Sequence, residues 1–165
     1  MKRLGLDYEA LKKLNSQLIY CAISGFGQTG PMSPRPAYDQ IIQGISGIMS
    51  ITGHEKKSPL RVGSPLADTI GGLTAAMAIS AALNKNPRGQ MIDVSMLDSV
   101  LTTMGWGVSN YLIGGILPTP QGNENITSAP SGTFQTKKGL INIAANEEKQ
   151  WQSLIKHLGC QYLSN

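Results

Sequence analysis

The sequence is poor in charged, aromatic and cysteine residues. Charged residues make up 15% of its 165 positions and aromatic residues 5%. So few aromatic side chains argue against the stacking platforms that bind single-stranded nucleic acid. The net charge is +4, but the lysines and arginines are scattered singly or in pairs, whereas a nucleic-acid-binding segment gathers them in one block or on one face. The composition therefore argues against nucleic acid as a partner.

Cysteine and histidine are too few and too dispersed for a metal site. Cys21 and Cys160 form no CxxC pair, and His54 and His157 are isolated, so we expect no bound metal. Cys21 lies in an apolar run, where we expect a buried free thiol and hence a reducing, cytoplasmic location. We expect no secretory signal peptide. The longest apolar stretch, 66–83, contains a carboxylate and two glycines, which favours a core helix over a membrane span.

Local patterns predict an α/β fold with a short parallel sheet. A first helix is followed by a continuous apolar strand, 17–23, which is typical of a strand buried on both faces of a parallel sheet. The predicted helices lie at 7–14, 36–49, 66–83, 95–112 and 147–158. The other predicted strands lie at 90–94, 133–136 and 140–144, the last two forming a hairpin. The long irregular segment 114–131 is expected to be functional or disordered.

A glycine-rich loop follows the first predicted strand. Its sequence is SGFGQTGP at 24–31, and it includes Gly25, Gly27 and Gln28. Glycines permit backbone conformations that other residues resist, and they allow a ligand or a neighbouring chain to approach closely. A loop at the carboxyl end of a buried strand is where open α/β sheets bind ligands. Glycine spacing alone fits a tight surface turn equally well.

The most informative residue is Asp68, at the head of the long helix of small residues predicted at 66–83. The unpaired N–H groups and the positive dipole end of a helix favour an anionic carboxylate there. Such a carboxylate serves either as a helix cap or as a nucleophile. The residue pattern by itself leaves both roles open.

Seven segments, in their order and spacing, carry a resemblance to a known enzyme family. They include RVGSPLAD at 61–68 and RGQMIDVSMLD at 88–98, together with 3–9, 18–31, 35–39, 47–53 and 110–112. Over residues 3 to about 158 the chain resembles the class III CoA-transferases of the CaiB/BaiF type, which include formyl-CoA and carnitine CoA-transferases. The resemblance implies a partial form of that α/β fold, with helices around a short parallel sheet and an α+β portion of the family's small domain.

In that family the aspartate that matches Asp68 is the nucleophile. It attacks the thioester of an acyl-CoA to form a mixed anhydride, and the released CoA thiolate then gives an aspartyl-CoA thioester that an incoming carboxylic acid resolves. The resemblance thus implies CoA or acyl-CoA and a carboxylic acid as partners. Tyr38 matches a family tyrosine near the nucleophile, where it either hydrogen-bonds the acyl group or only packs. Asp39, beside it, is either a structural carboxylate of the helix turn or a group that supports the catalytic residues, and the structural role is favoured.

The resemblance also suggests which residues contact CoA. Gly25, Gly27 and Gln28 are expected to line the pocket after the first strand. In the family, glycine loops shield the anhydride from water. The matching loop here contains Gly122 and Asn123, although it has no run of glycines.

Two alternative functions stay open. The superfamily also includes α-methylacyl-CoA racemases, whose catalytic histidine falls where this chain has Tyr38, and this substitution favours transfer over racemisation.

Family members are more than twice as long, so the resemblance implies an internal fragment with residues 1–114 in the large domain and 115–165 in part of the small one. Such a fragment is expected to form a dimer or a higher oligomer, either active or catalytically silent.

Overall fold

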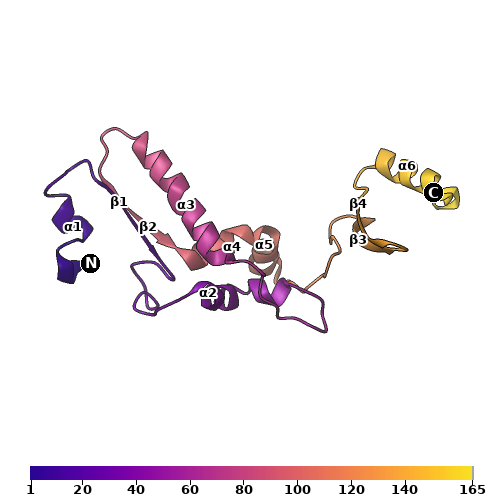
Figure 1. Ribbon diagram of the computed structural model, residues 1–165, viewed down its shortest axis with the longest axis horizontal. Coiled ribbons are helices and arrows are strands. Elements are labelled where there is room, and N and C mark those ends of the chain that lie inside the picture. Colours follow the sequence, from indigo (N-terminus) through magenta and orange to yellow (C-terminus); the bar gives the residue numbers. More distant parts are fainter. Residues whose placement is uncertain (165) are drawn as a thin grey trace.

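Two small sheets organise the chain, and an extended segment joins the parts built around them (Figure 1). The computed structural model describes residues 1–164. The first part contains β1 (Ile19–Ser24), β2 (Gln90–Ser95), α1 (Tyr8–Leu11), α2 (Asp39–Ser46), α3 (Leu66–Leu83), α4 (Met96–Thr103) and α5 (Gly105–Gly114). The second contains β3 (Ser131–Thr136), β4 (Gly139–Ala144) and α6 (Glu148–Leu158). Short 3-10 helices lie at Lys2–Leu4, Ile48–Ile51 and Gln161–Leu163.

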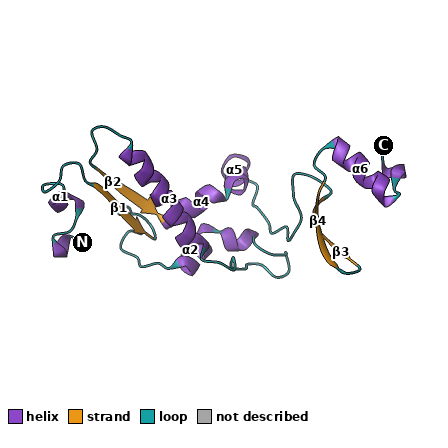
Figure 2. Ribbon diagram, turned by 45° about the horizontal axis from the view of Figure 1, so that its top comes forward, coloured by secondary structure: helices purple, strands orange, loops and turns teal. Residues whose placement is uncertain are grey.

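The first sheet is parallel, as the apolar run of the first strand predicted. β1 and β2 pair in register from Ile19 opposite Gln90 to Ser24 opposite Ser95. The connection between them carries α2 and α3, and α3 packs along both strands (Figure 2). The mixed α/β class with a short parallel sheet is therefore confirmed.

The prediction that the first strand is buried on both faces is wrong for this chain. Ile23 is 51% exposed, although it lies on the side of the strand that faces Gly71 of α3. A sheet of two strands with one helix along it leaves much of its surface uncovered. An apolar run indicates that a strand is suited to burial, but it does not indicate which helices or strands cover its two faces.

Two predicted helices have different bounds because glycines adopt left-handed conformations. The predicted helix 36–49 is shorter: α2 ends at Ser46, where Gly47 has φ 84° and a 3-10 turn follows. The predicted helix 95–112 is divided at Gly105, whose φ is 44°. Residues with positive φ interrupt a right-handed helix, and glycine adopts such angles without a steric penalty.

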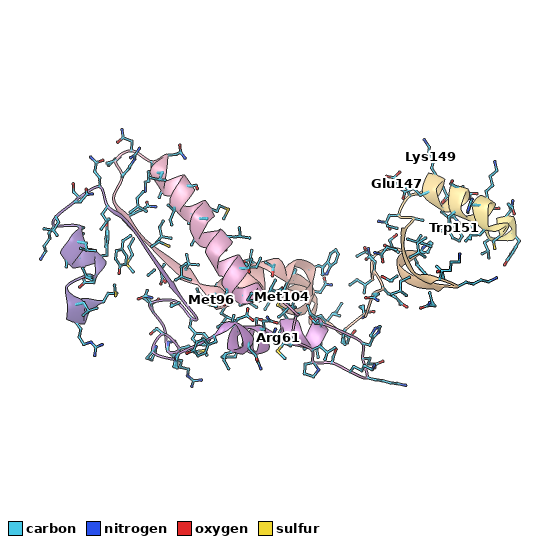
Figure 3. All side chains as sticks on the ribbon, viewed as in Figure 1. Arg61, Met96, Met104, Glu147, Lys149 and Trp151 are labelled. Carbon is cyan, nitrogen blue, oxygen red and sulfur yellow. The ribbon has the colours of Figure 1, made fainter. Side chains whose placement is uncertain are left out.

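The core of the first part lies where α2, α3 and α4 meet. Ile42, Ala67, Met96 and Val100 form a buried cluster, and Figure 3 shows Met96 at the foot of α3. A Cβ atom at Gly71 would lie 3.2 Å from Met96 Cγ, so the small residues of α3 allow close packing. Ala67, the residue before Asp68, is thus fixed from one side by the core.

Only one face of α3 packs in this way. Its buried residues are Ala67, Gly71, Ala75 and Ala82, whereas Leu73 and Met77 are exposed. Among the helices in residues 1–164, α3 is also long and apolar enough to cross a membrane. Its mean hydropathy is 1.5, and 22% of its residues are buried. The expectation of a core helix therefore holds along one face only.

The second part follows the predicted pattern. β3 and β4 form the predicted antiparallel hairpin. In α6, Glu147 makes reciprocal capping bonds with Gln150, and Gly159, with φ 70°, ends the helix. Glu147 and Trp151 of this part appear in Figure 3. The division into two domains at residues 114 and 115 stays a prediction.

Candidate active site

Asp68 lies in the first turn of α3 with its carboxylate unengaged. The helix has Pro65 as its N-cap, and Asp68 is exposed. An acidic residue three positions after an N-cap usually bonds back to the cap's N–H, but proline has no N–H to offer. Within residues 1–164 the Asp68 carboxylate makes no hydrogen bond or ion pair. Of the two roles open from the sequence, the cap is therefore not formed, and the carboxylate is free for a ligand.

The N-terminal ends of α2 and α3 meet beside Asp68. The Ala67 N–H donates to Asp39 Oδ1 at 2.7 Å. Tyr38 is the N-cap residue of α2 and is 80% exposed. Tyr38 directly precedes Asp39, and Asp68 directly follows Ala67. The hydrogen bond between Asp39 and Ala67 therefore brings the backbone at Tyr38 close to the backbone at Asp68. The packing role considered for Tyr38 is not fulfilled in this chain, because its ring is largely open to solvent.

The glycine-rich loop after β1 packs against the residues that lead into α2. A Cβ atom at Gly25 would overlap the Cβ of Ala37, so only glycine fits there without a shift. The Gly25 carbonyl accepts from the Leu97 N–H at 3.0 Å, which ties the loop to α4. Gly27 is buried with φ 83°. The loop is thus held close to Tyr38 and α2.

Asp93 of β2 fixes the far end of this loop. Its Oδ2 accepts from the Gln28 N–H at 2.8 Å, while Gln28 Nε2 donates to Ser24 Oγ at 3.3 Å. The Gln28 side chain is exposed. On the same strand pair, burial raises the pKa of the Cys21 thiol, and the negative charge of Asp93 adds to this rise.

Replacing Asp93 by alanine is expected to free the Gln28 N–H and loosen the loop. Because Asp93 is itself exposed, we expect the free energy of unfolding to fall by only about 1 kcal/mol. Amide hydrogen exchange at Gln28 should become faster. Glu55→Ala, which removes another exposed carboxylate, is the control and should leave that exchange unchanged. Unchanged exchange at Gln28 in Asp93→Ala would show that the loop does not depend on this bond.

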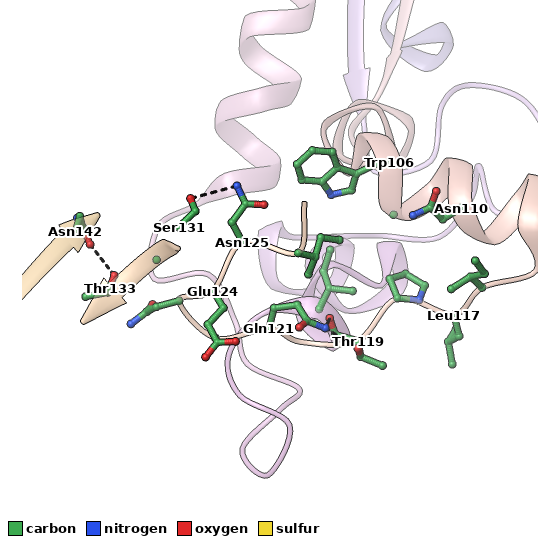
Figure 4. Close-up of a pocket in the computed structure, with 18 of the residues that line it drawn as sticks. Trp106, Asn110, Leu117, Thr119, Gln121, Glu124, Asn125, Ser131, Thr133 and Asn142 are labelled. Carbon is green, nitrogen blue, oxygen red and sulfur yellow. Dashed lines mark hydrogen bonds between the residues drawn. The ribbon is translucent and has the colours of Figure 1, made fainter. Parts of the chain in front are cut away.

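Gly122 and Asn123 lie in a different place, along a cavity of about 790 Å³. The Gly122 N–H donates to the Gly53 carbonyl at 2.7 Å, and Gly122, with φ 61°, lies directly against the His54 ring. Figure 4 shows Trp106 and Asn110 of α5 on one side of the cavity and the hairpin on the other. The five residues predicted to contact CoA thus fall into two groups within this chain.

The cavity lining is mostly apolar and also carries several amide side chains. Its walls carry Asn110, Gln121, Asn123, Asn125 and Asn142, and Glu124 is the charged residue among them. Asp68, Tyr38, Gly25, Gly27 and Gln28 do not line it. Such a lining suits a neutral polar chain better than a carboxylate, because it offers amide hydrogen bonds and no cation.

Several residues of the site were not predicted from the sequence. For Asp39 the structural role was favoured over a supporting one, and no role was assigned to Gln43 or Asp93. The available signal was a pair of polar residues one helical turn apart, Asp39 and Gln43, on a face that also carries the buried Ile42. No cluster of three or more potential metal ligands occurs in the part of the chain that the structure describes.

Comparison with known proteins identifies relatives along the whole chain. A family profile described as CoA-transferase family III matches residues 1–165. The succinate–glutarate CoA-transferase of Agrobacterium fabrum is 40% identical over 162 residues, covering 96% of this chain and 40% of that protein. The acetyl-CoA:oxalate CoA-transferase of Acetobacter aceti is 38% identical over 168 residues, covering 99% and 43%. The chain therefore spans about two fifths of the length of these curated relatives.

Solved structures agree with the sequence comparison. A CaiB/BaiF family protein from Brucella suis matches with a TM-score of 0.83 and 38% identity, covering 99% of this chain and 44% of that one. Rv3272 from Mycobacterium tuberculosis matches with a TM-score of 0.85 and 25% identity, covering 100% and 45%. The resemblance first seen in the sequence motifs is thereby confirmed.

Proposed function

Since this chain belongs to CoA-transferase family III, we propose that it carries the nucleophile of an acyl-CoA:carboxylate CoA-transferase and that this nucleophile is Asp68. The observation that carries the proposal is an exposed carboxylate without a partner in the first turn of a helix whose start is fixed by the core. An oriented, unengaged carboxylate is what nucleophilic catalysis by aspartate needs. The names of the relatives, all CoA-transferases, support the reaction class.

The proposed reaction conserves the energy of the thioester in four acyl-transfer steps. An Asp68 oxygen attacks the carbonyl carbon of the acyl-CoA, the C–S bond breaks, and a mixed anhydride and CoA thiolate form. The thiolate attacks the Asp68 carbonyl carbon and releases the first carboxylate, which leaves an aspartyl-CoA thioester. The acceptor carboxylate attacks this thioester to form a second anhydride and thiolate. Attack of that thiolate on the new acyl carbon yields the new acyl-CoA and restores the Asp68 carboxylate.

Tyr38 and the glycine loops have supporting roles in this proposal. The exposed Tyr38 hydroxyl would donate a hydrogen bond to the oxygen on which negative charge develops during each attack. Gly25, Gly27 and Gln28 would contact CoA near Asp68. Gly122 and Asn123, in their separate cavity, would contact a neutral part of the acyl-CoA such as its amide-containing arm.

The relatives point to small dicarboxylic acids as substrates. Their names include succinate with glutarate, and acetyl-CoA with oxalate. We therefore propose succinyl-CoA or a similar acyl-CoA as donor and a dicarboxylic acid as acceptor. The free, partly buried cysteines support a reducing, cytoplasmic setting.

Exposed apolar side chains support a dimer or a higher oligomer. Leu73, Met77, Leu112 and Ile113 are all exposed in this chain, and exposed apolar patches favour association. A chain that assembles without reacting is the alternative, and the covalent test below separates the two.

The covalent test is intact-protein mass spectrometry after incubation with succinyl-CoA. We expect a mass increase corresponding to CoA on the protein, converted by hydroxylamine to a hydroxamate that peptide mapping assigns to Asp68. Asp68→Ala should show no adduct under the same conditions. A folded protein that forms no adduct, or forms one at a different carboxylate, would contradict the proposed role.

A further inference from the structure

Two side chains of α2 hold the segment that leads into Asp68. Gln43 is completely buried, with 0% exposure. Its Nε2 donates to Asp39 Oδ2 at 2.8 Å and to the Ser64 carbonyl at 3.2 Å, and its Oε1 accepts from the Val62 N–H at 2.9 Å. Asp39 in turn accepts from the Ala67 N–H at 2.7 Å. Two residues one helical turn apart thus bind three backbone groups of the segment 62–67.

This arrangement replaces the local capping that the segment lacks. Residues 62–65 precede α3 without regular structure, and Pro65 offers no capping side chain. Backbone polar groups left without partners at a helix end destabilise it. Asp39 caps α3 from a different helix, and its negative charge also suits the positive end of the α3 dipole. The helix end is therefore satisfied without recruiting Asp68.

We infer that Asp39 and Gln43 are positioning residues for Asp68, an inference that rests on the nucleophilic role proposed above. They fix the backbone on the N-terminal side of Asp68, and Ala67 itself packs in the buried core cluster. They also satisfy the start of α3 without the Asp68 carboxylate, which has no cap N–H to bond because the cap residue is Pro65. Placement of a nucleophile to within about 1 Å is worth on the order of 100-fold in rate.

The hydrogen-bond directions allow a variant that breaks the pair and a second change that restores it. In Asp39→Asn, an amide oxygen still accepts from Ala67, but the amide nitrogen would face the donating Nε2 of Gln43. The double variant Asp39→Asn/Gln43→Glu reverses donor and acceptor between the two side chains. It keeps the bonds to Ala67 and Val62 and retains one negative charge in the pair, but it places a carboxylate oxygen against the Ser64 carbonyl, where two acceptors repel.

The experiment compares the full chain with these variants in transfer from succinyl-CoA to glutarate. For Asp39→Asn we expect kcat to fall by about 100-fold, with KM changed much less and with faster amide exchange at Val62, which bonds to the displaced Gln43 side chain. The double variant should recover part of kcat, because it restores the contact between the two side chains but not the bond to Ser64. Gln40→Ala, which alters an exposed side chain on the same helix, is the control and should match the wild type.

The outcomes separate the positioning role from the proposed function. Wild-type kcat in Asp39→Asn, with Asp68→Ala inactive, would overturn the positioning role alone. So would a double variant that regains the wild-type melting temperature but none of the lost kcat, because the loss would then not follow the hydrogen-bond geometry. Transfer that persists in Asp68→Ala would overturn the nucleophilic role, and with it this inference.

Discussion

Transfer of CoA from succinyl-CoA to glutarate is expected to fall by at least 1000-fold when Asp68 is replaced by alanine, on the order of the losses seen when a covalent nucleophile is removed. Each proposed step forms or breaks a bond at the Asp68 carboxyl group, so no neighbouring residue can replace it by a simple change of geometry. Initial rates at saturating substrate, followed by separation of the CoA thioesters, measure this loss.

The loss should not arise from unfolding. The Asp68 carboxylate makes no hydrogen bond within residues 1–164, so its removal takes away only its interaction with the α3 dipole, about 0.3–1 kcal/mol. Asp98→Ala is the matched control, because Asp98 is likewise an exposed carboxylate in the first turn of a helix, α4. It should lose similar stability and keep its activity. Equal activities of the two variants would exclude Asp68 as the nucleophile.

The largest expected effect on stability comes from Gly89→Ala, at the start of β2. Gly89 has φ 101°, and a Cβ atom there would overlap the carbonyl oxygen of Ser16, in a chain segment that leads into β1. A left-handed conformation disfavours alanine by roughly 1–2 kcal/mol, and overpacking adds about 1–3 kcal/mol. We therefore expect the free energy of unfolding to fall by about 3 kcal/mol, measured by urea denaturation.

The damage should be local to the parallel strand pair. The Gln90 N–H, which donates to the Leu18 carbonyl at 3.1 Å, should exchange much faster in Gly89→Ala. Gly72→Ala is the opposite case: no atom lies within 4 Å of the added methyl group, and alanine stabilises a helix interior by about 1 kcal/mol relative to glycine. If both variants unfolded at the same urea concentration, the steric argument at Gly89 would be wrong.

Local sequence patterns determined the elements and their order. The apolar run before Ser24 predicted a parallel strand, and two short strand segments on either side of the turn at 137–139 predicted the hairpin now seen as β3 and β4. The small residues from Leu66 predicted α3, with Asp68 in its first turn. These features follow from periodicity, capping and turn chemistry, which act between residues a few positions apart. The ordered motifs also identified the family, because their order and spacing can be read along the chain without knowledge of the fold.

Only the tertiary structure decided how the site is held together. Asp39 caps α3 from 28 positions away, and Asp93 binds the Gln28 N–H across 65 positions. It also decided that Gly122 and Asn123 lie along a cavity that Gly25, Gly27 and Gln28 do not line, and that Ile23 stays half-exposed. Contacts between remote segments depend on how whole elements pack, and no periodicity in either segment encodes its partner. The sequence therefore identified Asp68 as a candidate nucleophile, whereas the contacts between α2 and α3 explain how the backbone beside it is held.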